Sequence, residues 1–70
     1  MYFTYVLRSA KDGKFYIGST GDLDRRVKRH TDGFVVATKN RRPLELVYKE
    51  PHETEQRALQ RELFFQNRPR

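Results

Sequence analysis

Five residues of this sequence have side chains and spacings that could act on a phosphate group or move a proton. Tyr5 and Tyr16 lie in two aromatic segments near the N-terminus. Arg26 and His30 are four residues apart, which would place them on the same face of a helix. Glu62 is the one acidic residue among the apolar positions of the C-terminal segment. Together these residues could supply a proton carrier, a fixed positive charge and a carboxylate.

The pair formed by Arg26 and His30 allows two interpretations. A guanidinium is planar and always charged, so Arg26 could present a fork to a phosphate, and His30 could transfer a proton near neutral pH. Alternatively, the stem of Arg26 covers apolar surface and His30 caps the end of the helix. Arg25 and Arg29 form a second pair with the same spacing, and we expect this pair to be turned further toward solvent.

Glu62 also allows two interpretations. A lone carboxylate on the inner edge of a helix could hold a divalent cation. Magnesium fits such a site because it accepts one protein carboxylate together with water and phosphate oxygens. The alternative is an ion pair between Glu62 and a nearby arginine. No pair of carboxylates has the spacing expected of a two-metal site. The sequence also contains no Ser-His-Asp or Cys-His set and no P-loop.

The elements that must position these residues follow from hydrophobic periodicity and turn residues. One domain over residues 1–70 is expected. It is of the α+β class, with a small antiparallel three-stranded sheet and helices packed on it, in the order β-β-α-β-α. The predicted strands are residues 2–8, 14–19 and 43–50, and the predicted helices are residues 21–32 and 52–66.

Capping and strand-breaking residues set the expected ends of these elements. Ser19 or Thr20 could cap the first helix, and Thr54 could cap the second. Pro51 is expected to break the third strand. The side chains expected to face the core are Leu23 and Val27 in the first helix, Leu44, Leu46 and Tyr48 in the third strand, and Ala58, Leu59, Leu63 and Phe64 in the second helix.

The hairpin formed by the first two strands decides whether the two tyrosines can act together. If residues 9–13 form the turn, Val6 lies opposite Tyr16. A bulge in the turn would then be needed to bring Tyr5 and Tyr16 onto one face. Gly18 follows Tyr16 on the same face and indicates open space for the close approach of a ligand. The alternative is that both tyrosines are ordinary sheet aromatics and Gly18 ends the strand.

The composition favours a nucleic-acid partner. The chain has 15 lysines and arginines against nine aspartates and glutamates, a formal net charge of +6 on 70 residues. Such an excess favours polyanions, and no helix sets a wide apolar face against a basic one, as binding to a membrane surface would require. Residues 34–43 are expected to form a basic loop that contacts nucleic acid.

Further properties of the sequence exclude other classes of protein. The chain has no cysteine, so disulfides and thiolate zinc sites are excluded. No apolar run is long enough to span a membrane, and the N-terminal residues lack the features of a signal peptide. We therefore expect a soluble, cytoplasmic protein without membrane contact.

The motifs, taken in order, resemble those of the GIY-YIG nuclease superfamily, and in particular its small stand-alone bacterial members. The first strand carries Thr4-Tyr5-Val6 in place of the GIY tripeptide, and the second carries the full YIG motif at residues 16–18. The segment DLDRR, then His30, then the segments RRPLELVY and ALQRE follow at the spacing typical of that family. The resemblance covers nearly the whole chain.

This resemblance implies a metal-dependent endonuclease that hydrolyses DNA phosphodiester bonds by a one-metal mechanism. It implies that Tyr5 is a candidate general base and that Tyr16 orients or stabilises the reacting groups. It also implies that Arg26 holds the scissile phosphate and that His30 assists proton movement. Glu62 would anchor one Mg²⁺ or Mn²⁺ ion.

Two further functions stay open. The first is a module with the same fold that binds nucleic acid without cutting it. The second is an interaction protein, in which Phe64 and Phe65 dock on a second copy of the chain or on another protein. The residues expected to contact nucleic acid are Gly18, Arg25, Arg29, Lys39, Arg41 and Arg42.

Overall fold

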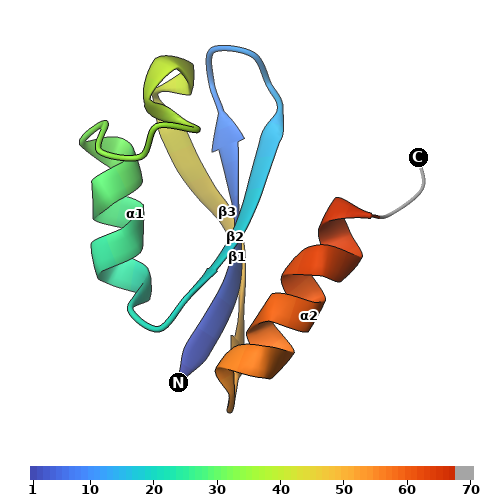
Figure 1. The fold of residues 1–70 in the computed structure, drawn as a ribbon. Helices are drawn as coiled ribbons and strands as arrows, with labels where there is room; N and C mark the ends of the chain where they lie inside the picture. The colour runs from blue at the N-terminus through green and yellow to red at the C-terminus, as the bar shows by residue number, and fades with distance from the viewer. Residues whose placement is uncertain (68–70) are drawn as a thin grey trace.

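A three-stranded antiparallel sheet lies between two helices, one on each face. Figure 1 shows this arrangement in the computed structural model, which describes residues 1–67. The strand order in the sheet is β2-β1-β3. The α+β class and the order β-β-α-β-α are therefore confirmed. The elements are β1 (Tyr2–Ser9), β2 (Phe15–Thr20), α1 (Leu23–Thr31), the short 3₁₀ helix η1 (Lys39–Arg41), β3 (Leu44–His52) and α2 (Glu55–Gln66).

The start of α1 differs from the sequence prediction. The N-cap is Asp22, whose side chain accepts a hydrogen bond from the backbone N–H of Arg25 at 3.2 Å. Ser19 and Thr20 do not cap the helix because β2 continues through both. The Thr20 hydroxyl instead accepts from the backbone N–H of Asp22 at 3.1 Å, which turns the chain from the strand into the cap. The predicted cap of α2 is confirmed, since Thr54 accepts from the N–H of Arg57 at 3.2 Å.

Strand β3 departs from the prediction at two places. It runs through Pro51, which pairs with Phe3, so the expectation that this proline breaks the strand is wrong. β3 is an edge strand, where a residue without an N–H can be accommodated. A bulge also separates the pairs Leu7–Leu46 and Val6–Tyr48. The extra residue moves Tyr48 off the face that carries Leu46, and Tyr48 is 46% exposed instead of facing the core.

The apolar core lies between the sheet and α1. Tyr5, Leu7 and Leu23 are its buried members. The partly buried residues packed against them are Phe3, Tyr16, Val27, Leu44 and Leu46.

Helix α2 covers the opposite face of the sheet and contacts all three strands. Ala58 is 1% exposed, and its carbonyl accepts a hydrogen bond from the Thr4 hydroxyl at 2.8 Å. The prediction that Leu59, Leu63 and Phe64 join Ala58 in the core is wrong, because they are 45%, 56% and 57% exposed. The side of α2 that faces the sheet carries Ala58, Glu62 and Phe65, so the three predicted core residues lie on its outer side.

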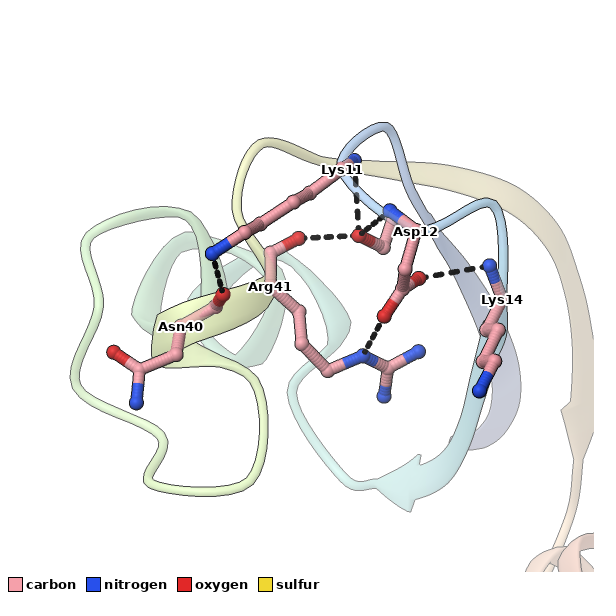
Figure 2. A network of polar contacts seen from close by, with 6 residues as sticks. Lys11, Asp12, Lys14, Asn40 and Arg41 are labelled. Atoms are coloured by element: carbon pink, nitrogen blue, oxygen red, sulfur yellow. Dashed lines mark hydrogen bonds and ion pairs between the residues drawn. The ribbon is translucent and has the colours of Figure 1, made fainter.

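A polar network ties the turn between β1 and β2 to the segment that contains η1 (Figure 2). The Ser9 hydroxyl donates to the carbonyl of Arg41 at 2.5 Å and accepts from the backbone N–H groups of Lys11 and Asp12. The Lys11 ammonium donates to the carbonyl of Asn40 at 3.1 Å, and the Arg41 Nε donates to Asp12 at the same distance. The segment predicted as a loop is therefore fixed to the tip of the hairpin.

Candidate functional site

The hairpin register brings the two tyrosines onto one face of the sheet. Tyr5 pairs with Gly18, and Leu7 pairs with Tyr16, so the predicted pairing of Val6 with Tyr16 is wrong by one residue. The cause is the turn, because the backbone N–H of Ser9 donates to the carbonyl of Lys14 and leaves four residues in the loop instead of five. No bulge in the turn is needed to place Tyr5 and Tyr16 on the same side.

Gly18 makes room for Tyr5. A Cβ atom built on Gly18 would lie 2.5 Å from Tyr5 Oη and 2.7 Å from Tyr5 Cζ. The space predicted beside Tyr16 is therefore filled by the ring of Tyr5 and is not open to a ligand. Any larger residue at position 18 would displace the Tyr5 hydroxyl.

The Tyr5 hydroxyl lies at the centre of a chain of polar contacts. Arg26 Nε donates to Tyr5 Oη at 3.4 Å, and His30 Nε2 lies 3.0 Å from the same oxygen. His30 Nδ1 lies 2.7 Å from the Thr38 hydroxyl. Tyr5, His30 and Thr38 have no exposed surface. The aromatic ring of Tyr16 completes the cluster, with its centroid 5.0 Å from that of the His30 ring.

The direction of these bonds is assigned by giving every buried polar proton an acceptor. Arg26 Nε can only donate, so Tyr5 Oη accepts from it and its own proton remains available for His30 Nε2. A neutral imidazole that accepts at Nε2 carries its proton on Nδ1, which then donates to the Thr38 hydroxyl. This arrangement directs the Tyr5 proton toward His30.

The ionisation of these groups is set mainly by burial. Burial, helped by the positive charge of Arg26, lowers the pKa of His30 from 6.5 to about 4. Burial also raises the pKa of Tyr5 above its ordinary value, although the hydrogen bond from Arg26 acts in the opposite direction. At neutral pH the histidine is therefore uncharged and the tyrosine keeps its proton. The sequence had suggested that His30 either caps the helix or has a pKa near neutral. In the structure His30 is buried and its pKa is well below neutral.

Glu62 reaches the same edge of the sheet from α2. Glu62 Oε1 accepts from the Ser19 hydroxyl at 2.7 Å, and Glu62 Oε2 accepts from Gln66 Nε2 at 3.0 Å. Ser19 is the neighbour of Gly18, and the charge of Glu62 is one of the smaller causes that raise the pKa of Tyr5. The alternative of an ion pair with arginine is not found, since no salt bridge within residues 1–67 includes Glu62.

Glu62 is one carboxylate, and it could serve as a single ligand to a magnesium ion. Within the described part of the chain no group of three or more His, Cys, Asp or Glu side chains could hold a metal. Glu62 is half-buried and its partners are neutral. A hard cation that keeps most of its waters needs only one such carboxylate, whereas a metal that requires an all-protein cage would not be held here.

The predicted nucleic-acid contacts divide among three hollows. Arg25 and Arg29 lie with Arg26 along a hollow of about 270 Å³ beside α1. Arg41 lines a groove of about 740 Å³ that also includes Tyr16. The remaining two basic residues, Lys39 and Arg42, line a separate hollow with Lys11.

Three residues near the site were not singled out from the sequence. Thr38 holds His30 from a segment without periodicity, so no local pattern indicates it. Ser19 lies directly after the Tyr16-Ile17-Gly18 segment, which was the one available signal. Lys14 lines the same groove as Arg41, and its position directly before β2 gives it access to that groove.

The predicted docking end of α2 is only partly exposed. Phe64 is 57% exposed, whereas Phe65 is half-buried, with its ring centroid 6.1 Å from that of Tyr48. The Arg61 guanidinium lies over both phenylalanine rings, at 4.9 Å and 4.5 Å from their centroids. A protein partner or second copy at this end stays a prediction. Within residues 1–67, neither helix is long and apolar enough to cross a membrane.

A family model, several sequence relatives and a solved structure match this chain. The family model of the GIY-YIG catalytic domain matches residues 1–70. The UPF0213 protein YazA of Bacillus subtilis (strain 168) is 45% identical over 65 residues, which cover 91% of this chain and 65% of YazA. The chain thus spans just under two thirds of the length of that relative. A UPF0213 protein of Staphylococcus aureus (strain Mu3 / ATCC 700698) is 42% identical over 62 residues, covering 87% of this chain and 74% of that protein.

A solved structure has the same fold. The solution NMR structure of the UPF0213 protein BH0048 from Bacillus halodurans superposes with a TM-score of 0.62 at 33% sequence identity. The superposition covers 100% of this chain and 76% of that protein.

Proposed function

The chain belongs to the GIY-YIG family, and on this basis we propose that it is an endonuclease that hydrolyses DNA phosphodiester bonds with one bound divalent metal ion. The observation that carries the proposal is the contact of Arg26 and His30 with one tyrosine hydroxyl, at an edge of the sheet where Glu62 also lies. These groups supply a phosphate ligand, a route for a proton and a metal ligand. We propose that the protein acts in the cytoplasm.

Arg26 is the proposed ligand of the scissile phosphate. Its Nε donates to Tyr5, which leaves the terminal nitrogens of the guanidinium for phosphate oxygens. Arg25 and Arg29 line the same hollow and add positive charge where the polyanion would approach. Fixed positive charge beside the phosphate stabilises the negative charge that accumulates in the transition state.

Tyr5 and His30 are the proposed route for the proton. As a water oxygen forms its bond to phosphorus, its proton passes to Tyr5 Oη, and the Tyr5 proton passes to His30 Nε2. The bond from phosphorus to the leaving oxygen breaks, and that oxygen takes a proton from solvent. After the products leave, His30 returns its proton to Tyr5 Oη, and the proton first taken from the water passes from Tyr5 to solvent. This relay avoids a free tyrosinate, which the raised pKa of Tyr5 disfavours. Tyr16 would hold the imidazole in place through its ring contact.

Substrate binding would prepare this relay through Arg26. Tyr5 has no exposed surface, so the attacking water reaches its hydroxyl only if the long 3.4 Å bond from Arg26 gives way. A phosphate that draws the guanidinium toward itself would open that path. It would also compensate the positive charge that helps to lower the pKa of His30, so His30 would become a better proton acceptor.

Glu62 is the proposed metal ligand, for Mg²⁺ or Mn²⁺. When bound, the ion would neutralise charge on the leaving oxygen. Ser19 and Gln66 hold the carboxylate in position through hydrogen bonds to its two oxygens. Positioning by neutral groups leaves the full negative charge of Glu62 for a cation.

A second candidate function is a module that binds nucleic acid without cutting it. The observation that favours it is the complete burial of Tyr5, together with the hydrogen bonds that already satisfy both Glu62 oxygens. Such a module would use the same basic surface and would show strongly salt-dependent binding without turnover.

Cleavage assays separate the two functions. Labelled single-stranded, duplex, nicked and branched DNA, and RNA, would be incubated with the protein in Mg²⁺, in Mn²⁺ and in chelator. Glu62→Gln is the matched variant because it keeps the size of the side chain and removes its charge. Metal-dependent products that are absent with Glu62→Gln support the nuclease. Binding without products from any substrate supports the module instead.

A further inference from the structure

The groove beside the hairpin tip has no role in the mechanism proposed above. It has a volume of about 740 Å³ and lies between the start of β2 and the C-terminal end of α2. At one end it includes Tyr16 and Gln66, which contact His30 and Glu62 respectively. The groove is therefore continuous with the candidate site.

The charge in this groove is of one sign. Of its eight lining residues, two are charged, and both are cations, Lys14 and Arg41. Lys14 directly precedes β2, and Arg41 comes from η1, so two segments far apart in sequence contribute one cation each. Two converging cations without a lining carboxylate favour an anion, and a guanidinium favours a phosphate in particular.

Asp12 holds the Arg41 side chain in position. One carboxylate oxygen of Asp12 accepts from Arg41 Nε at 3.1 Å, and the other accepts from the backbone N–H of Lys14 at 2.8 Å. The backbone of Arg41 is fixed as well, because its carbonyl accepts from the Ser9 hydroxyl. Figure 2 shows that the side chains of Lys14 and Arg41 extend in the same direction past Asp12.

The terminal nitrogens of Arg41 have no role in this network. The one hydrogen bond that the Arg41 side chain makes within residues 1–67 is through Nε. Nη1 and Nη2 therefore remain available to an anion, while the Nε bond restricts the rotation of the guanidinium. An arginine fixed in this way loses less conformational entropy when it binds than a mobile one.

We infer that Lys14 and Arg41 bind a second phosphate of the nucleic-acid strand, one that flanks the scissile phosphate at Arg26, and that Asp12 is the positioning residue of Arg41. This inference rests on the proposed function, since it supposes that nucleic acid occupies the site. Contacts to two phosphates, one near each end of β2, would align the strand along β2. Phosphate contacts of this kind fix the register of a nucleic acid without reading its sequence.

Binding of fluorescein-labelled DNA, measured by anisotropy in chelator across a series of salt concentrations, tests this inference without depending on cleavage. The variants are Lys14→Gln, Arg41→Gln and the double variant. Arg57→Gln is the matched control, because it removes the same charge from an exposed residue that lines a different hollow and has no proposed contact with nucleic acid.

Arg41→Gln is expected to weaken binding about tenfold more than Arg57→Gln, the size of one lost charge-assisted hydrogen bond. The double variant should weaken binding less than the product of the two single effects, because both side chains hold one phosphate. Its slope of log K against log salt should fall by roughly 0.7 to 0.9, the loss of one phosphate contact.

Asp12→Asn distinguishes positioning from overall charge, because the two effects would change DNA binding in opposite directions. The substitution raises the formal net charge from +6 by one, so attraction by overall charge alone would tighten binding. Asp12 uses a different oxygen for each of its two donors, and asparagine replaces one of these oxygens with an NH₂ group that cannot accept, so loss of positioning would weaken binding. Weaker binding by Asp12→Asn, with an unchanged circular dichroism spectrum, supports the inference.

The outcomes distinguish this inference from the proposed function. If the wild type binds DNA and the Lys14, Arg41 and Asp12 variants follow overall charge as Arg57→Gln does, the second phosphate site is wrong and the proposed function stands. If the wild type binds neither DNA nor RNA at any salt concentration, both are wrong. Lys14 is exposed, so Lys14→Gln keeps the test valid even if another variant fails to fold.

Discussion

Replacing Gly18 by alanine tests whether the position of Tyr5 depends on the missing side chain at position 18. The added Cβ would lie 2.5 Å from Tyr5 Oη, whereas ordinary contact begins near 3.4 Å. The hydroxyl must therefore move by about 0.9 Å, the difference between these distances. Tyr5 is fully buried, so no solvent-filled space is available to receive it.

The expected cost follows from two opposing effects. Overpacking in a filled core costs about 1–3 kcal/mol. Alanine in place of glycine inside a strand returns about 0.5–1 kcal/mol, because the unfolded chain loses less freedom on folding. The net loss of unfolding free energy is therefore between about 0 and 2.5 kcal/mol. For a domain of this size a loss near 1.5 kcal/mol lowers Tm by roughly 6–12 °C.

Urea unfolding and thermal melts monitored by circular dichroism measure this loss. Gly21→Ala is the control, because its Cβ would meet only the edge of the Tyr2 ring, at 3.1 Å. The double variant with Tyr5→Phe should recover part of the stability, since the closest contact is with the hydroxyl. Unchanged stability of Gly18→Ala, with the His30 side-chain NMR signals of the wild type, would refute the argument.

Three other predictions concern the rest of the site. Glu62→Gln should abolish metal-dependent cleavage. It should leave the fold intact, because the neutral amide can still accept from the Ser19 hydroxyl. Cleavage at the wild-type rate would contradict the assignment of Glu62 as the metal ligand. Thr38→Val leaves the buried N–H of His30 without an acceptor, so it should lower the unfolding free energy by about 1–3 kcal/mol in urea. It should also shift the NMR signals of the His30 ring nitrogens, whereas Thr38→Ser should behave like the wild type. The pKa of His30 is about 4 in the folded protein and 6.5 ordinarily, so the unfolded chain binds more protons between these values. Stability from the neutral His30 should be complete above pH 6.5 and be lost as the pH falls toward 4, with a change of up to roughly 3 kcal/mol relative to His30→Gln in urea titrations at each pH. Equal pH dependence of the two proteins would contradict the low pKa.

The elements of the fold could be predicted because their signals are local. Aromatic and β-branched runs marked β1 and β2, and the Thr54 cap marked the start of α2. The position of Tyr16 and Gly18 on one face followed from their spacing alone. Patterns of this kind depend on neighbouring residues, which a sequence displays directly.

The contacts that could not be predicted depend on pairing between distant segments. The hairpin register is set by the hydrogen bond from Ser9 to Lys14, and a change of one residue there moves every side chain to the other face. The bulge that exposes Tyr48 arises in the pairing of β1 with β3, which no property of either strand alone determines. Thr38 meets His30 only because the segment before β3 is fixed to the hairpin tip.

The most buried side chains of this protein include the polar groups Tyr5, His30 and Thr38. This has a consequence for how the family can diverge. A lineage that no longer needs to cut nucleic acid could replace the half-buried Glu62 or Arg26 at little cost to folding. Replacing the buried tyrosine or histidine would instead leave a cavity or an unsatisfied donor. Inactive descendants should therefore keep the tyrosine and histidine as a relic of packing, so the glutamate and arginine are the better markers of activity in a related genome.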